Sequence, residues 1–191
     1  MRTVARLLSC AISVSGMLAA SPMAGTQGVA QIQPPHDPAH AANAVDWCAI
    51  HLARRELVQA MSDCNYAVAT MPNSSKALSN RGSVWLTAGD PTKALEDFEA
   101  AIALNPGQAD LFYNRGLAHG KLGNSDAAIA DYSRAILLEP GLAIAYHNRG
   151  YEHELRSNFA DALKDYERAI ELAPDLKPPA EGIRRLTKGR L

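Results

Sequence analysis

The chain has 191 residues, of which 47% are hydrophobic and only 6% are aromatic, so its composition predicts one modest soluble domain packed mainly through aliphatic side chains and alanine. This composition excludes a fibre and an intrinsically disordered chain. The formal net charge of −1 includes no basic excess, which argues against nucleic acid or a polybasic membrane patch as the partner.

The first thirty residues, 1–30, have the layout of a secretory signal peptide. Arg2 and Arg6 precede an apolar run from Leu7 to Ala20, small residues follow, and the stretch contains no acidic residue. The run is about fourteen residues long, which is short for a membrane anchor. A lipid anchor at Cys10 is disfavoured because only nine residues precede it.

Cleavage is expected after Ala30, with Ala20 and Ala24 as alternatives, so that the mature chain has no membrane span. We expect export and, if the source is a Gram-negative bacterium, a periplasmic location. Residues 31–40 contain three prolines among polar residues and predict a flexible proline-rich arm.

The remaining sequence repeats itself every 34 residues. The triplet Asn-Arg-Gly begins at Asn80, Asn114 and Asn148, and other columns recur at the same interval. These columns are Ala94, Ala128 and Ala162; Phe98, Tyr132 and Tyr166; Ala101, Ala135 and Ala169; and Pro106, Pro140 and Pro174. Such a period is the sequence signature of a repeat architecture.

The period and its columns resemble the tetratricopeptide repeat (TPR) family. The middle unit carries the resemblance through Phe112, Arg115-Gly116, His119, Ala128, Tyr132 and Pro140, although arginine replaces the family's leucine in all three clear units. The resemblance implies an all-α fold, a right-handed α-solenoid of helix-turn-helix repeats. Its expected parts are a degenerate unit at 41–74, clear units at 75–108, 109–142 and 143–176, and a capping helix and tail at 177–191.

Each clear unit is expected to form two helices joined by a turn. Glycine in the turn permits a left-handed residue, and Asp90, Ser125 or Asn158 can cap the second helix. Glycine in the middle of the first helix costs about 1 kcal/mol relative to alanine. We therefore expect Gly82, Gly116 and Gly150 to mark close approach by the aromatic residue of the second helix.

Two recurring charges predict a ladder of ion pairs between the two helices of each unit. Arg81, Arg115 and Arg149 recur together with Asp97, Asp131 and Asp165. Asp63 continues the acidic column into the first unit, where Trp47 replaces the arginine.

Metal and catalytic sites are disfavoured by geometry. His51, His119 and His153 share one column with Trp85, and helices that pack 8–10 Å apart hold such residues too far apart for one zinc ion; His147 lies nearby only in sequence. A nucleophile cluster of Cys48, His51 and Asp46 would occupy one helix, where Asp46 points away from the other two. We therefore expect no metal, no cofactor and no enzymatic activity.

Cys48 and Cys64 remain after signal removal. The repeat resemblance places them in the glycine and aromatic columns of one unit, which touch in that architecture, and an exported chain favours a disulfide between them. Two buried free thiols are the alternative.

The strongest functional signal is the asparagine column, because similar repeat proteins line their concave groove with amides that bind an extended peptide. An amide both donates and accepts hydrogen bonds, which matches a peptide backbone. The predicted groove consists of Asn80, Asn114, Asn148, Ser79, Tyr113, His147, Ser83, Leu117, Tyr151 and Lys121. The alternative is that these asparagines only support the solenoid.

These observations predict a non-enzymatic adaptor or scaffold of the cell envelope that binds a protein or peptide in its concave groove. The second hypothesis is a structural subunit of a homo-oligomer or envelope assembly, using the convex face or a terminal repeat.

Overall fold

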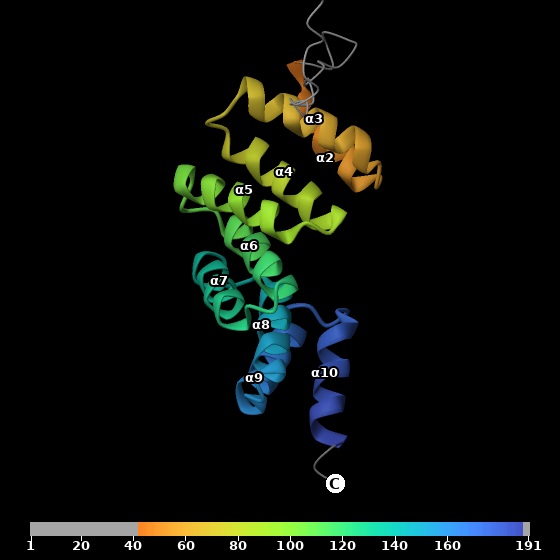
Figure 1. Ribbon diagram of the computed structural model, residues 1–191. Coiled ribbons are helices and arrows are strands. Elements are labelled where there is room, and N and C mark those ends of the chain that lie inside the picture. Colours follow the sequence, from red (N-terminus) through yellow and green to blue (C-terminus); the bar gives the residue numbers. More distant parts are fainter. Residues whose placement is uncertain (1–41, 189–191) are drawn as a thin grey trace, which may run out of the picture. The chain divides into compact units, whose positions relative to one another are not determined.

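The computed structural model describes residues 42–188. The predicted signal peptide and proline-rich arm, together with residues 189–191, lie outside this range. Within it every regular element is an α-helix (Figure 1). The helices are α2 (Ala44–Ala53), α3 (Leu57–Thr70), α4 (Ser75–Ala88), α5 (Pro91–Leu104), α6 (Ala109–Lys121), α7 (Ser125–Leu138), α8 (Ala143–Leu155), α9 (Phe159–Leu172) and α10 (Lys177–Lys188).

Consecutive helices pack as hairpins, α2 with α3, α4 with α5, α6 with α7 and α8 with α9. The second helix of each hairpin also packs against the first helix of the next one, and α10 packs on α9. The predicted all-α solenoid of helix-turn-helix units is therefore confirmed. No helix among residues 42–188 combines the length and the apolarity needed to cross a lipid bilayer.

The glycine column lies where the two helices of a hairpin come closest. A Cβ atom on Gly82 would lie 2.8 Å from the ring of Phe98, and a Cβ atom on Gly116 would lie 2.7 Å from the ring of Tyr132. In the fourth unit a Cβ atom on Gly150 would lie 2.9 Å from the ring of Tyr166. These distances are well inside ordinary carbon–carbon contact. The prediction that a tertiary contact offsets the low helix propensity of glycine is confirmed.

The turn within each hairpin contains one residue in the left-handed conformation. Gly89 (φ 88°) and Gly123 (φ 77°) supply it in the second and third units, whereas Arg55 (φ 61°) and Ser157 (φ 62°) occupy the same position in the other two. A non-glycine residue is strained there because its Cβ meets the backbone.

One of the three predicted capping residues makes its hydrogen bond. Asp90 accepts from the backbone N–H of Lys93 at 3.1 Å. The prediction for Ser125 was wrong, because α7 already begins at this residue and Asn124 occupies the capping position. Asn158 sits at the start of α9, but its side chain makes no capping hydrogen bond.

The predicted ladder of ion pairs is present in all three clear units. Each arginine donates two hydrogen bonds to the carboxylate 16 residues later, and the Arg115–Asp131 pair spans 2.8 and 2.7 Å. The aspartate is almost completely buried, so it depends on this partner. In the first unit, where Trp47 occupies the arginine column, His51 contacts the aspartate instead, with its Nδ1 2.6 Å from the carboxylate of Asp63.

Helix α10 closes the C-terminal end of the described repeats. Its Gly182 lies directly against the ring of Tyr166, which leaves no space for a larger side chain. Arg185 donates hydrogen bonds to Glu154 at 3.1 and 2.9 Å, and the hydroxyl of Tyr166 donates to the same carboxylate at 2.7 Å. These charge-assisted bonds join α10, α9 and α8.

Candidate functional site

A hollow of about 480 Å³ lies between the first helices of the second and third units, and we name it the α4–α6 hollow. The first three turns of α4 and the first two turns of α6 line it, with Gln108 at the start of α6. The lining consists of Lys76, Ser79, Asn80, Ser83, Gln108, Asp110, Tyr113 and Asn114. Most of these side chains are neutral hydrogen-bonding groups around one phenol ring.

The structure brings half of the predicted groove residues together. Five of them line the α4–α6 hollow: Ser79, Asn80, Ser83, Tyr113 and Asn114. The others lie further along α6 and on α8 and do not line it: Leu117, Lys121, His147, Asn148 and Tyr151. Tyr151 is nevertheless 46% exposed, so it can be reached from solvent.

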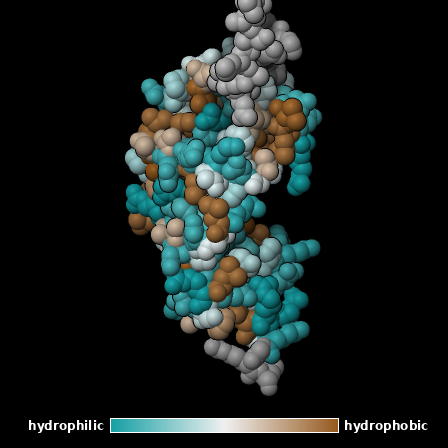
Figure 2. All heavy atoms as spheres, in the orientation of Figure 1, coloured by the Kyte–Doolittle hydropathy of each residue, from teal (hydrophilic) through white to brown (hydrophobic). Residues whose placement is uncertain are grey.

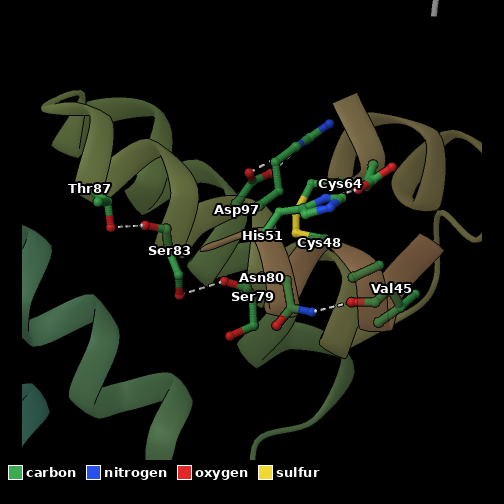
Figure 3. Close-up of a disulfide and its surroundings, with 12 residues drawn as sticks. Val45, Cys48, His51, Cys64, Ser79, Asn80, Ser83, Thr87 and Asp97 are labelled. Carbon is green, nitrogen blue, oxygen red and sulfur yellow. Dashed lines mark hydrogen bonds and ion pairs between the residues drawn. A yellow bond between two sulfur atoms is a disulfide. The ribbon is translucent and has the colours of Figure 1, made fainter. Parts of the chain in front are cut away.

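The three asparagines of the repeated column differ in their hydrogen bonds. Asn80 donates through Nδ2 to the backbone oxygen of Val45 at 2.9 Å, which links α4 to α2 (Figure 3). Asn148 donates through Nδ2 to the hydroxyl of Tyr113 at 3.2 Å, which links α8 to α6. Within residues 42–188 the side chain of Asn114 has no such bond. Asn80 and Asn148 thus join neighbouring units, whereas the amide of Asn114 has its donors and its acceptor available for a ligand.

Tyr113 forms one wall of the hollow and is fixed by contacts with Tyr132 and Asn148. Its ring centroid lies 5.9 Å from that of Tyr132. Burial raises the pKa of Tyr113, and the hydrogen bond from Asn148 acts in the opposite direction. The phenol is therefore neutral at physiological pH and presents an aromatic surface with a polar tip.

His147 is half-buried and packs against Tyr166, and it does not line the α4–α6 hollow. Its ring lies 5.6 Å from that of Tyr166, and its Nδ1 is buried without a hydrogen-bond partner within the described residues. Burial lowers the pKa of His147, the positive charge of Arg185 lowers it further, and Glu154 opposes the shift. The side chain belongs to the packing between α8, α9 and α10.

Three residues of the hollow escaped the sequence analysis: Lys76, Gln108 and Asp110. Lys76 and Asp110 occupy one repeat column, four residues before Asn80 and Asn114, so helical periodicity could have identified them. Lys76 contacts the carboxylate of Asp46 at 2.7 Å. With Asp110 opposite, the rim of the hollow carries charges of both signs.

The first hairpin contains a disulfide between Cys48 on α2 and Cys64 on α3, as predicted (Figure 3). Their Cα atoms are 5.2 Å apart, and both residues are completely buried. His51 is turned toward Asp63. Within the part of the chain that the structure describes, no three His, Cys, Asp or Glu side chains are grouped closely enough to hold a metal ion.

Comparison with known families agrees with this geometry. The family model described as "Tetratricopeptide repeat" matches residues 109–142 and 143–176, and a second model, "TPR repeat", matches residues 82–123. The chain is a tetratricopeptide repeat protein. TPR proteins generally act as non-catalytic interaction modules, so the family supports a role in protein interaction. No curated protein matches the sequence.

Solved TPR structures share this fold. A structure titled "Crystal structure of MamA protein" is 22% identical, with a TM-score of 0.70 over 78% of this chain and 82% of that one. The TPR domain of Arabidopsis OM64 is 27% identical, with a TM-score of 0.60 over 61% of this chain and 96% of that one. The first TPR of Spaghetti (RPAP3), solved with the HSP90 peptide SRMEEVD, is 24% identical, with a TM-score of 0.60 over 61% and 92%.

Proposed function

We propose that this TPR protein is an exported, non-enzymatic adaptor that binds an extended segment of a partner protein in the α4–α6 hollow. The observation that carries the proposal is the amide of Asn114, which lines the hollow and has no hydrogen bond within residues 42–188. A peptide backbone presents one donor and one acceptor per residue, and a single carboxamide can satisfy both.

The other two asparagines assist less directly. Asn80 and Asn148 each donate one N–H of Nδ2 inside the solenoid, and Asn148 does not line the hollow. These bonds hold α4 against α2 and α6 against α8. Each helix that lines the hollow is thus bonded to a neighbouring helix before a peptide arrives, which lowers the entropic cost of binding.

The composition of the rim predicts which peptides are preferred. The peptide in the RPAP3 complex is acidic, but here Lys76 already contacts Asp46, and Asp110 would repel a carboxylate. Ser79, Ser83 and the hydroxyl of Tyr113 offer neutral hydrogen bonds beside an aromatic surface. We therefore expect neutral polar segments with one apolar or aromatic side chain to bind in preference to acidic ones.

The first thirty residues and the Cys48–Cys64 disulfide support an exported, envelope location for this protein, because disulfides persist in oxidising compartments. Fractionation of the source cells, with intact mass measured without reductant, tests this location. We expect the protein in the envelope fraction with an oxidised cysteine pair. Recovery in the cytosol with both thiols reduced would contradict it.

Site-specific photo-crosslinking tests the binding site. A photoreactive residue placed at Ser83 lines the hollow, whereas one placed at Leu137, which is 69% exposed on α7, serves as the control. We expect a partner to be crosslinked from position 83 only, and Asn114→Ala to remove the product while the fold, followed by circular dichroism, is retained. Equal crosslinking from both positions would refute groove binding.

The second hypothesis, a homo-oligomeric structural subunit, predicts a different result. Light scattering of the isolated protein would then give a multiple of the chain mass in the absence of any peptide. Asn114→Ala would not change that mass.

A further inference from the structure

A second hollow, of about 580 Å³, lies between the first half of α9 and the last turns of α10, and we name it the α9–α10 hollow. It shares no lining residue with the α4–α6 hollow. Its apolar lining comes from Phe159, Ala160, Leu163 and Leu186. A mostly apolar hollow of this size can accept several bulky side chains.

The start of α9, which lines this hollow, differs in sequence from the start of α7 in the preceding unit. The 34-residue register aligns Phe159 and Ala160 with Ser125 and Asp126. Asp126 makes an ion pair with Arg156 of the next unit, and alanine cannot make such a pair. Phe159 is 46% exposed. The fourth unit thus replaces a polar bridge with an exposed aromatic side chain, the residue type that anchors protein interfaces.

Basic side chains outnumber acidic ones beside the apolar lining. Lys164 and Arg185 belong to the lining, and each has an acidic partner on this chain. Arg185 also borders a smaller adjoining hollow, which is lined by one acidic residue, Glu181, and by Arg184 and Lys188. Among the described residues neither Arg184 nor Lys188 makes an ion pair. The basic side chains without partners therefore lie on α10, next to the apolar hollow.

We propose that the α9–α10 hollow docks an amphipathic helix of a partner protein, with bulky apolar residues on one face and Asp or Glu beside them. Two helices form the walls of the hollow, and a groove between helices receives the side chains that a third helix presents at positions i, i+4 and i+7. The cations without partners select acidic flanks. Figure 2 shows exposed hydrophobic side chains among hydrophilic ones near this end of the described chain. This inference does not depend on peptide binding in the α4–α6 hollow.

Selection from a displayed library of random peptides of about 16 residues, long enough for about four helical turns, tests the proposal on the mature protein. We expect enriched peptides that combine apolar residues at helical spacing with Asp or Glu. Phe159→Ser, which restores the residue type of the third unit, should weaken their binding at least tenfold, because it removes a large apolar contact. The double charge reversal Arg184→Glu, Lys188→Glu should weaken it and reduce its salt dependence.

Two control variants test whether the enriched peptides bind at this surface. Leu137→Ser, at an exposed apolar residue outside the hollow, and Asn114→Ala, in the α4–α6 hollow, should each leave the affinity unchanged. Enriched peptides that are basic, or whose binding Phe159→Ser does not alter, would overturn the proposal. The proposal would also be overturned if no acidic peptide were enriched and the hollow served another occupant. That occupant would be a second copy of the protein if Phe159→Ser abolished self-association, or a membrane if it abolished binding to anionic phospholipid vesicles.

Discussion

The contact between Gly116 and Tyr132 decides whether Gly116→Ala raises or lowers the free energy of unfolding. A Cβ atom added at Gly116 would lie 2.7 Å from Cε1 and 2.9 Å from Cδ1 of Tyr132. Ordinary carbon–carbon contact needs about 3.5 Å, so the two helices must separate by nearly 1 Å. Because Tyr132 is 2% exposed, it has little room to move.

The magnitude follows from two opposing effects. Gly→Ala in a helix interior adds about 1 kcal/mol of stability through backbone entropy. Overpacking a core typically costs about 1–3 kcal/mol, and a shift of this size belongs near the upper end. Gly116→Ala should therefore lower the free energy of unfolding by about 1–2 kcal/mol.

The assay is a double-mutant cycle measured by urea unfolding and circular dichroism. In a Tyr132→Val background the obstructing ring carbons are gone, and Gly116→Ala should then raise the free energy of unfolding by about 1 kcal/mol. The expected coupling is about 2–3 kcal/mol. Stabilisation by Gly116→Ala in both backgrounds would refute the steric role assigned to the glycine column.

Three further predictions follow from contacts within and between the units. Arg115→Met should lower the free energy of unfolding by about 2 kcal/mol, because it leaves the buried carboxylate of Asp131 without its partner; a cycle with Asp131→Asn in urea unfolding that shows no coupling would contradict this. Ser157→Gly should raise the melting temperature by relieving a left-handed residue, a gain of about 1 kcal/mol, whereas Ser125→Gly, at the first residue of α7, should not raise it. Burial depresses the pKa of His147, so the stability that this residue contributes is fully present above its unfolded pKa of about 6.5 and is lost as the pH falls through its folded pKa. Between about pH 7 and pH 5 the melting temperature should therefore fall less for His147→Phe than for the wild type. Equal falls in melting temperature would exclude this contribution.

Some of the candidate site could be predicted because it lies on the repeat itself. The asparagine column and its neighbours on the first helices follow from a fixed period, and five predicted residues line the α4–α6 hollow. The period could not distinguish Asn114 from Asn80, since equivalent positions in different units have different neighbours. Val45 accepts from Asn80 only because the first unit packs there.

The α9–α10 hollow could not be predicted from the sequence. Phe159 departs from its column, but its exposure depends on how α10 packs against α9. That packing is set by Gly182 against Tyr166 and by Arg185 on Glu154, contacts between segments with no shared periodicity.

The amino-acid sequence by itself determined the unit: its length of 34 residues, its two helices, the close approach marked by glycine and the Arg–Asp pair that joins them. These features follow from local propensity and from side chains at fixed spacing on neighbouring helices, so a linear pattern contains them. Only the tertiary structure decided which asparagine keeps an amide without internal hydrogen bonds, that His147 packs against Tyr166, and where the hollows lie. These properties depend on the relative placement of units, which is set by the packing of side chains far apart in the sequence.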